Sequence, residues 1–200
     1  MADQVVRNTR EAVLERSVSL FAAAGFHGVS MRDIAADVGV TPAALYHHFP
    51  DKEQLYLGVV AYAFEEKMGP LKAHLDGEGN AWEQLEAFIT QLAGLLTADR
   101  DFLRLMQWVM LDNDEKRQRS LADCVFRDMF SELERLATKL APQRDSHLLV
   151  ASLMGMVIFP FEALPVQRFM PDYRGQLEAP EVMARHVVNL LRNGLGSETA

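Results

Sequence analysis

Several features that mark particular protein classes are scarce or absent in this 200-residue chain. The single cysteine, Cys124, cannot form a disulfide within the chain, which fits a reducing cytoplasm. Residues 1–10 are polar and charged, so we expect no secretory signal peptide there. The longest nearly apolar run, residues 148–161, is shorter than the ~20 residues that span a bilayer. We therefore expect a cytoplasmic protein without a membrane partner, in which this run is a buried helix.

The short motifs of common enzyme classes are also missing. The sequence contains no G-x-S-x-G, H-E-x-x-H, P-loop or dinucleotide-binding pattern. Paired carboxylates at Glu65-Glu66 and at Asp112 and Asp114 are explained more simply as solvated surface groups. A small enzyme on a helical body remains an alternative, but it leaves no residue as a catalytic candidate. We expect a protein that is not an enzyme and that needs no cofactor.

An excess of positive charge is absent as well. The net charge of the chain is −8, and residues 1–56 carry five basic and seven acidic side chains, a net of −2. A protein held on DNA mainly by phosphate contacts would be basic. Binding to a specific site needs only a local positive face, which Arg7, Arg10, Arg32 and Lys52 can supply together with helix N-termini.

Helix capping signals are dense in residues 30–52, SMRDIAADVGVTPAALYHHFPDK. Ser30 can accept a hydrogen bond from a free N–H of a helical first turn, and Asp33 can reach back to the same end. Gly39 supplies the positive φ that a sharp turn needs. Thr41 caps a second helix with Pro42 at its first position. The stretch predicts two short helices joined by a tight turn, with a third beginning near Asp51.

Apolar spacing shows how these two helices pack. Ile34 and Val38 share one helix face, Leu45 and Phe49 point back to them, and Ala35 permits a close crossing. The pattern predicts a helix-turn-helix, which exposes the N-terminal residues of its second helix to the DNA major groove. An ordinary helical hairpin is the alternative, because small and apolar residues at these spacings are only moderately specific.

The flanking residues favour the first interpretation. The segment LFAAAGFHGVSMRDIAADVGVTPAALYHHFPDKEQL resembles the N-terminal domain of the TetR family of transcriptional regulators. The matching elements are Leu20-Phe21, Gly25-Phe26, Gly28, Ile34-Ala35, Val38-Gly39-Val40, Leu45-Tyr46, His48-Phe49, Lys52-Glu53 and Leu55. The resemblance covers roughly the first quarter of the chain. It implies an all-α fold with a three-helix DNA-binding domain at residues 1–52 and a helical effector-binding and dimerisation domain at residues 53–200.

The resemblance also implies which residues meet DNA. Ala43 can touch only a thymine methyl, whereas the Tyr46 and Thr41 hydroxyls suit phosphate oxygens. His48 is open between a phosphate contact and a packed core histidine, and we expect no metal at His47-His48 because adjacent helical side chains diverge. The predicted DNA contacts are Ser30, Arg32, Thr41, Pro42, Ala43, Tyr46, His47, His48 and Lys52.

Helical periodicity continues through the rest of the chain. Gly69-Pro70 is expected to interrupt or end the helix that follows Asp51, where a hinge or an ordinary helix end are both consistent with the sequence. Pro160 and Pro165 are expected to end or kink the apolar helix. Further helices are predicted over residues 8–24, 80–98, 101–111, 116–141, 144–160 and 180–194.

By the same resemblance, the last two helices, about residues 146–161 and 180–194, pair across a two-fold axis, and the body holds a small molecule. Methionine and aromatic side chains suit an adaptable apolar pocket, although such residues are more often plain core. The predicted ligand contacts are Met106, Trp108, Met110, Phe126, Met129, His147, Met154, Phe159 and Glu162.

The sequence as a whole predicts a dimeric repressor that a small lipophilic or aromatic ligand releases from a palindromic DNA operator. A helical adaptor that binds only protein is the remaining alternative, but it leaves the predicted exposure of Thr41, Tyr46 and His47 without a role.

Overall fold

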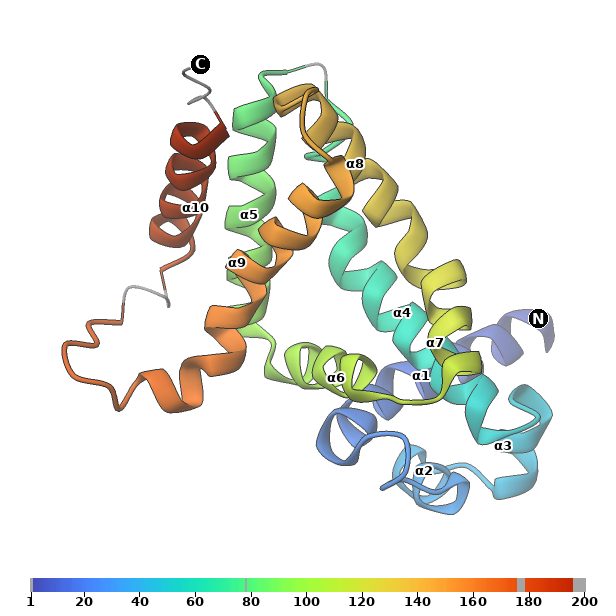
Figure 1. Cartoon of the computed structure of the whole chain (residues 1–200). Coiled ribbons are helices and arrows are strands. Elements are labelled where there is room, and N and C mark those ends of the chain that lie inside the picture. Colours follow the sequence, from blue (N-terminus) through green and yellow to red (C-terminus); the bar gives the residue numbers. More distant parts are fainter. Residues whose placement is uncertain (1, 78, 176–178, 196–200) are drawn as a thin grey trace. The chain divides into compact units, whose positions relative to one another are not determined.

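The computed structural model describes residues 2–77, 79–175 and 179–195, and side chains from residue 9 to 194 within those ranges. The described residues form helices joined by turns and loops, and they contain no strand (Figure 1). The helices are α1 Ala2–Ala24, α2 Met31–Val38, α3 Pro42–His48, α4 Lys52–Lys72, α5 Ala81–Ala98, α6 Arg100–Leu111, α7 Glu115–Leu121, a π-helical turn η1 Ala122–Phe126, α8 Arg127–Leu140, α9 Ser146–Gln167 and α10 Pro180–Leu195. The expected all-α fold is confirmed.

Two compact units divide these helices. The N-terminal unit consists of the chain up to Glu66 together with Arg100–Phe126, and the C-terminal unit consists of Lys67–Asp99 and the chain from Arg127 onward. The predicted boundary between residues 52 and 53 falls inside the N-terminal unit, which also contains most of α4 and all of α6 and α7. Three short helices bury too little apolar surface alone, and α6 supplies more by packing along α1.

The core of the N-terminal unit is built from aromatic and branched aliphatic side chains. Phe21, Leu45 and Val59 are fully buried there, and Tyr56 is 1% exposed. The ring of Tyr56 meets the edges of Phe21 at 5.1 Å and of Phe26 at 5.3 Å between centroids. The arrangement connects α1, the turn that follows it and α4, so the helix-turn-helix rests on a rigid base.

In the C-terminal unit, α5 is the central helix. It packs against α8, α9 and α10, and α10 runs beside it (Figure 1). The face of α9 that carries Val150, Leu153 and Val157 is buried. With 22 residues, α9 is longer than the predicted apolar run and is long and apolar enough to cross a membrane by those two criteria alone. A helix with one face in a protein core and a second apolar face meets the same criteria.

Contrary to expectation, the helices continue past their prolines. The helix α4 continues through Gly69 and Pro70 to Lys72, and α9 continues through Pro160 and Pro165 to Gln167. A proline removes one intrahelical hydrogen bond and crowds the preceding turn. Pro70 and Pro165 lie in the last turn of their helices, where little helix follows, and tertiary packing of α9, including the buried Phe161, continues past Pro160.

The helix expected over residues 116–141 is also different. A π-helical turn, η1, separates α7 from α8. Such a turn widens the helix by one residue and shifts the faces on either side of it. In this turn, Phe126 directs its ring to Phe64 of α4, with centroids 5.0 Å apart.

Candidate DNA-binding surface and effector site

Helix α2 begins with a reciprocal cap. The Asp33 amide donates to the Ser30 hydroxyl at 3.2 Å, and the Ser30 amide donates to the Asp33 carboxylate at 3.0 Å. The Ser30 hydroxyl also donates to that carboxylate at 2.6 Å. These hydrogen bonds stabilise the charged carboxylate and lower the pKa of Asp33. The predicted capping pair is therefore confirmed, and it defines where α2 starts.

A tight turn places α3 across α2. Gly39 has φ 79°, in the left-handed region, and the amides of Gly39 and Val40 both donate to the Ala35 carbonyl. Thr41 then caps α3 by accepting from the Ala44 amide at 3.2 Å, with Pro42 in the first turn. Ile34 and Leu45 are fully buried and Ala35 is 1% exposed. The predicted helix-turn-helix is confirmed in these details.

Most predicted DNA contacts lie on the exposed side of this motif. Tyr46 is 51% exposed, while the neighbouring Leu45 is fully buried. His48 is half-buried, with its ring 5.5 Å from His47 and 6.5 Å from Phe49. Arg7 lies outside the residues whose side chains are described. The exposed predicted contacts are Ser30, Arg32, Thr41, Pro42, Ala43, Tyr46 and His47.

Lys52 has a different environment from the other predicted contacts. Its ammonium group donates to the carbonyls of Phe26 at 2.8 Å and Val29 at 3.0 Å. It also lies 4.3 Å from the centroid of the Phe26 ring. These contacts hold the turn between α1 and α2, so the ammonium charge of Lys52 is engaged inside the N-terminal unit. Contact with a phosphate would have to share the same ammonium group.

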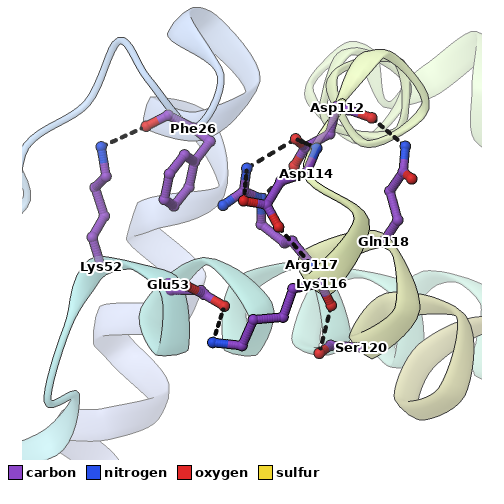
Figure 2. Close-up of polar contacts among 9 residues, drawn as sticks. All are labelled: Phe26, Lys52, Glu53, Asp112, Asp114, Lys116, Arg117, Gln118 and Ser120. Carbon is purple, nitrogen blue, oxygen red and sulfur yellow. Dashed lines mark hydrogen bonds and ion pairs between the residues drawn. The ribbon is translucent and has the colours of Figure 1, made fainter.

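Sequence reasoning missed a buried arginine in this unit. Arg117 of α7 is 3% exposed, and its guanidinium pairs with both carboxylate oxygens of Asp112, at 2.9 Å for the Nη2–Oδ1 pair. The guanidinium carbon lies 3.9 Å from the centroid of the Phe26 ring (Figure 2). Local sequence carries no signal for this, because residues 112–119 form a charged run that is typical of a solvated face.

Hydrogen bonding within this pair shifts both titrations. The bond from Arg117, with smaller contributions from its charge and from His27, holds the pKa of Asp112 below its usual value despite burial. The same bond raises the pKa of Arg117. Burial, followed by the charge of Asp112, raises the pKa of Tyr56 to about 12. The pair is therefore ionised at neutral pH, and the tyrosine beside it is neutral.

An open pocket borders the buried arginine. It has a volume of about 420 Å³ and is lined by residues 24–27 of the turn after α1 and by Trp108, Leu111, Asp112, Asn113, Asp114 and Arg117. The Trp108 indole donates to the Ala22 carbonyl at 3.2 Å and covers Gly25, where a Cβ would lie 2.8 Å from the ring. Among the described residues, no group of three or more His, Cys, Asp or Glu side chains is placed to hold a metal ion.

Residues 13–59 match the family model described as bacterial regulatory proteins, tetR family. Residues 13–59 therefore form an N-terminal domain of TetR-family type. The match spans the second half of α1, α2, α3 and the first part of α4. Sequence relatives of this chain include the nucleoid occlusion factor SlmA of Vibrio vulnificus, 26% identical over 164 residues that cover 78% of this chain and 84% of the relative. The SlmA of Idiomarina loihiensis is 23% identical over 150 residues, covering 75% and 76%.

Solved structures share the fold over most of this chain. FadR from Bacillus subtilis in complex with stearoyl-CoA superposes with a TM-score of 0.76 at 15% identity, covering 92% of this chain and 97% of FadR. AibR in complex with isovaleryl coenzyme A and operator DNA superposes with a TM-score of 0.70 at 24% identity, covering 91% and 97%. At these identities, the superpositions establish that this chain has the fold of both proteins.

The predicted ligand contacts of this chain are divided between its two units. Met106, Trp108, Met110 and Phe126 belong to the N-terminal unit, where only Trp108 lines the 420 Å³ pocket. Met110 is 66% exposed. In the C-terminal unit lie Met129, which is buried, Met154, which is half-buried, and His147, Phe159 and Glu162, which are exposed.

Within the C-terminal unit these residues do not converge on one cavity. His147 lies 3.0 Å from Glu134 and stacks obliquely on Phe130, while Phe159 and Glu162 are on the exposed side of α9. An apolar gap between α5, α8, α9 and α10 has a volume of about 20 Å³, close to the space of one water molecule. The predicted contacts therefore remain a prediction, which requires the body to open around a ligand.

Proposed function

We propose that this chain is a homodimeric TetR-family repressor that binds a palindromic operator and leaves it when a small lipophilic ligand binds the body. The observation that carries the proposal is the exposed face of α3, with Thr41, Tyr46 and His47 outward on a fully buried Ile34–Leu45 base. A short helix with an exposed outer face is the element that reads base edges in the major groove. The function of residues 1–52 is then DNA reading, in the cytoplasm and without catalysis.

Dimerisation is supported by α9, which carries apolar or small residues on two sides. One face is buried in the C-terminal unit, and the other exposes Leu148 (64%), Phe159 (61%) and Val166 (61%). Exposed Ala151 and Gly155 lie on the same stripe and would let a second helix approach closely. The exposed Val182 and Leu190 of α10 suit a four-helix interface with a second copy, rather than a membrane. Two copies would hold their reading helices ~34 Å apart, one turn of DNA.

An acyl-coenzyme A is the first ligand class to test. The solved complexes of FadR and AibR contain acyl-coenzyme A molecules, and the apolar and methionine-rich body of this chain suits the same lipophilic group. A ligand releases DNA only if it binds the DNA-incompetent state more tightly than the competent one. Effector binding and dimerisation would then belong to residues 53–200.

The test begins with selection of bound sites from random duplex DNA, at a stated salt concentration, using the purified full chain. A palindrome with half-sites about one helical turn apart is expected. Fluorescence anisotropy on that site then measures release by acyl-coenzyme A molecules of increasing chain length, with free coenzyme A as the control. Folded protein that enriches no palindrome would contradict the proposal at its first step.

A DNA-bound factor of the nucleoid occlusion type is the second candidate. The SlmA relatives favour it, as does the gap of only about 20 Å³ inside the C-terminal unit. The same experiment separates the two functions. Enrichment of a palindrome whose binding is unchanged by every acyl-coenzyme A would favour the second candidate over a ligand-released repressor.

A further inference from the structure

The turn between α1 and α2 is held by side chains from two distant parts of the sequence. Phe26 is at its centre, and Figure 2 shows the Phe26 side chain between those of Lys52 and Arg117. Lys52 lies 4.3 Å and Arg117 3.9 Å from the Phe26 ring centroid. A cation over an aromatic face is attracted by the ring quadrupole, and more strongly when it is desolvated. Phe26 therefore has a cationic partner from α4 and a second one from α7.

Lys52 also ties the two ends of this turn together. Its ammonium group bonds the Phe26 and Val29 carbonyls, and Val29 directly precedes the Ser30 cap of α2. The start and the direction of α2 therefore depend on how Phe26 and Lys52 are placed. Only Gly39, Val40 and Thr41 separate α3 from α2. The direction of α2 therefore also sets the direction of α3, the helix proposed to read DNA.

Two carboxylates orient Arg117 itself. Asp112 accepts from Arg117 with both carboxylate oxygens and from the Asp114 amide at 3.1 Å. Asp114 adds a second carboxylate 3.8 Å from the guanidinium, and its side chain caps α7 by accepting from the Arg117 amide at 3.0 Å. A planar guanidinium can stack on Phe26 and bond Asp112 at the same time, which an ammonium group cannot do.

We propose that Arg117 is a positioning residue for operator recognition: its guanidinium, fixed by Asp112, holds Phe26 and thereby the turn that aims α2 and α3. The inference deepens the proposed DNA-binding function and rests on it. It assigns a role in DNA recognition to a residue of α7, which is not part of the helix-turn-helix. It also accounts for why a charged side chain is buried here. For packing alone, an apolar side chain could fill the same space at a lower desolvation cost.

The experiment removes the Arg117 side chain and then supplies free guanidinium ion in its place. Arg117→Ala leaves a guanidinium-sized space beside the open pocket of about 420 Å³, through which a small ion can enter. We expect Arg117→Ala to bind the selected operator at least about tenfold more weakly, equivalent to about 1.4 kcal/mol. Millimolar guanidinium, far below denaturing concentration, should restore part of that affinity, whereas ammonium at the same ionic strength should not.

Matched variants separate positioning from charge and from folding. Arg119→Ala removes an equal charge from an exposed site of the same helix and should bind operator like the wild type in the same buffers. Arg117→Lys keeps the charge but loses the planar fork, so it should stay folded and still bind more weakly. Binding of all variants to random DNA should change little, because phosphate contacts carry it.

The outcomes are distinguishable. If the wild type selects no operator, the proposed function has failed before the inference is tested. If the wild type binds and Arg117→Ala or folded Arg117→Lys binds equally well, Arg117 does not position the motif. A loss that guanidinium does not repair better than ammonium also overturns the proposal, since lost packing alone would then explain it. Should Arg117→Ala fail to fold, Arg117→Lys decides the question by the same affinity comparison.

Discussion

Two adjacent residues of α3 have opposite environments, so substitution of one should affect DNA binding and substitution of the other should affect stability. Tyr46 is 51% exposed on the proposed DNA face, whereas Leu45 is fully buried against Ile34 and Ala35. Tyr46→Ala should weaken operator binding by about 1 kcal/mol, the order of one hydrogen bond, and leave stability nearly unchanged. Leu45→Ala should cost about 2–5 kcal/mol of unfolding free energy.

Anisotropy titration and urea unfolding measured on both variants check this prediction. Gln91→Ala, an exposed change on α5, serves as the control for both measurements. A Tyr46→Ala protein that binds operator like the wild type would remove Tyr46 from the DNA-binding surface. The two variants also test the alternative of an adaptor that binds only protein, because such a protein would show no operator binding to be weakened.

Asp112 gives a pH dependence whose direction follows from its environment. The Arg117 hydrogen bond lowers the folded-state pKa of Asp112 below the unfolded value of 3.8, so the folded protein binds this proton less tightly than the unfolded chain. The resulting stabilisation is complete above the unfolded pKa and is lost as pH falls through the folded pKa. Wild-type stability should therefore decline below about pH 4.

Urea unfolding as a function of pH tests that sign. Asp112→Asn should be less stable at neutral pH, because it leaves the buried Arg117 charge without its partner. Its stability should also fall less steeply in acid than that of the wild type. Asp128→Asn, at an exposed position of α8, controls for the general effect of acid. Parallel pH profiles for the wild type and Asp112→Asn would show that this pair contributes nothing to acid sensitivity.

At the scale of elements, the end of α1 depends on one glycine. Gly25 has φ 65°, and a Cβ there would lie 2.8 Å from the Trp108 ring. Gly25→Ala should therefore destabilise the protein by about 1 kcal/mol or more, through backbone strain and displacement of the indole. Thermal unfolding with Trp fluorescence measures both effects. Gly79→Ala, where nothing lies within 4 Å of the added Cβ, should be nearly neutral, and equal losses in the two variants would contradict this account.

Helix ends also show how far local patterns reach. The caps at Ser30, Thr41 and Asp114 depend on residues within three positions, so their residue types alone indicate helix starts. Gly69-Pro70 and Pro160 do not end their helices, because Pro70 lies in the last turn of α4 and the packing of α9 continues past Pro160 to the buried Phe161. The π-helical turn at residues 122–126 has no signal in the apolar spacing around it.

The whole molecule is the scale at which dimerisation belongs. Phe159 is 61% exposed on the outer stripe of α9, next to Gly155 and in line with Leu148. Phe159→Asp should shift the protein from dimer to monomer, because the substitution places charge in a proposed apolar interface. Sedimentation velocity over a range of concentrations measures this directly, and unfolding should lose its dependence on concentration.

Lys139→Asp provides the matched control, since it adds a carboxylate at an exposed site of α8 away from this stripe. It should remain dimeric. Monomeric Phe159→Asp should also lose high-affinity operator binding, since a single reading helix contacts only one half-site. If both variants sediment as the wild type does, the exposed stripe of α9 is not the dimer interface.

The sequence by itself determined the all-α fold, the capped helices α2 and α3, the buried Leu45 and Ala35, and the family of the N-terminal domain. Each depends on hydrogen bonds and apolar spacing within a few residues, which one-dimensional patterns record. Only the tertiary structure decided that Lys52 faces inward, that Arg117 is buried on Phe26, and that α6 and α7 belong to the same compact unit as α2 and α3. These contacts join residues that are far apart in the chain, so the sign and burial of each charge follow from its neighbours in space.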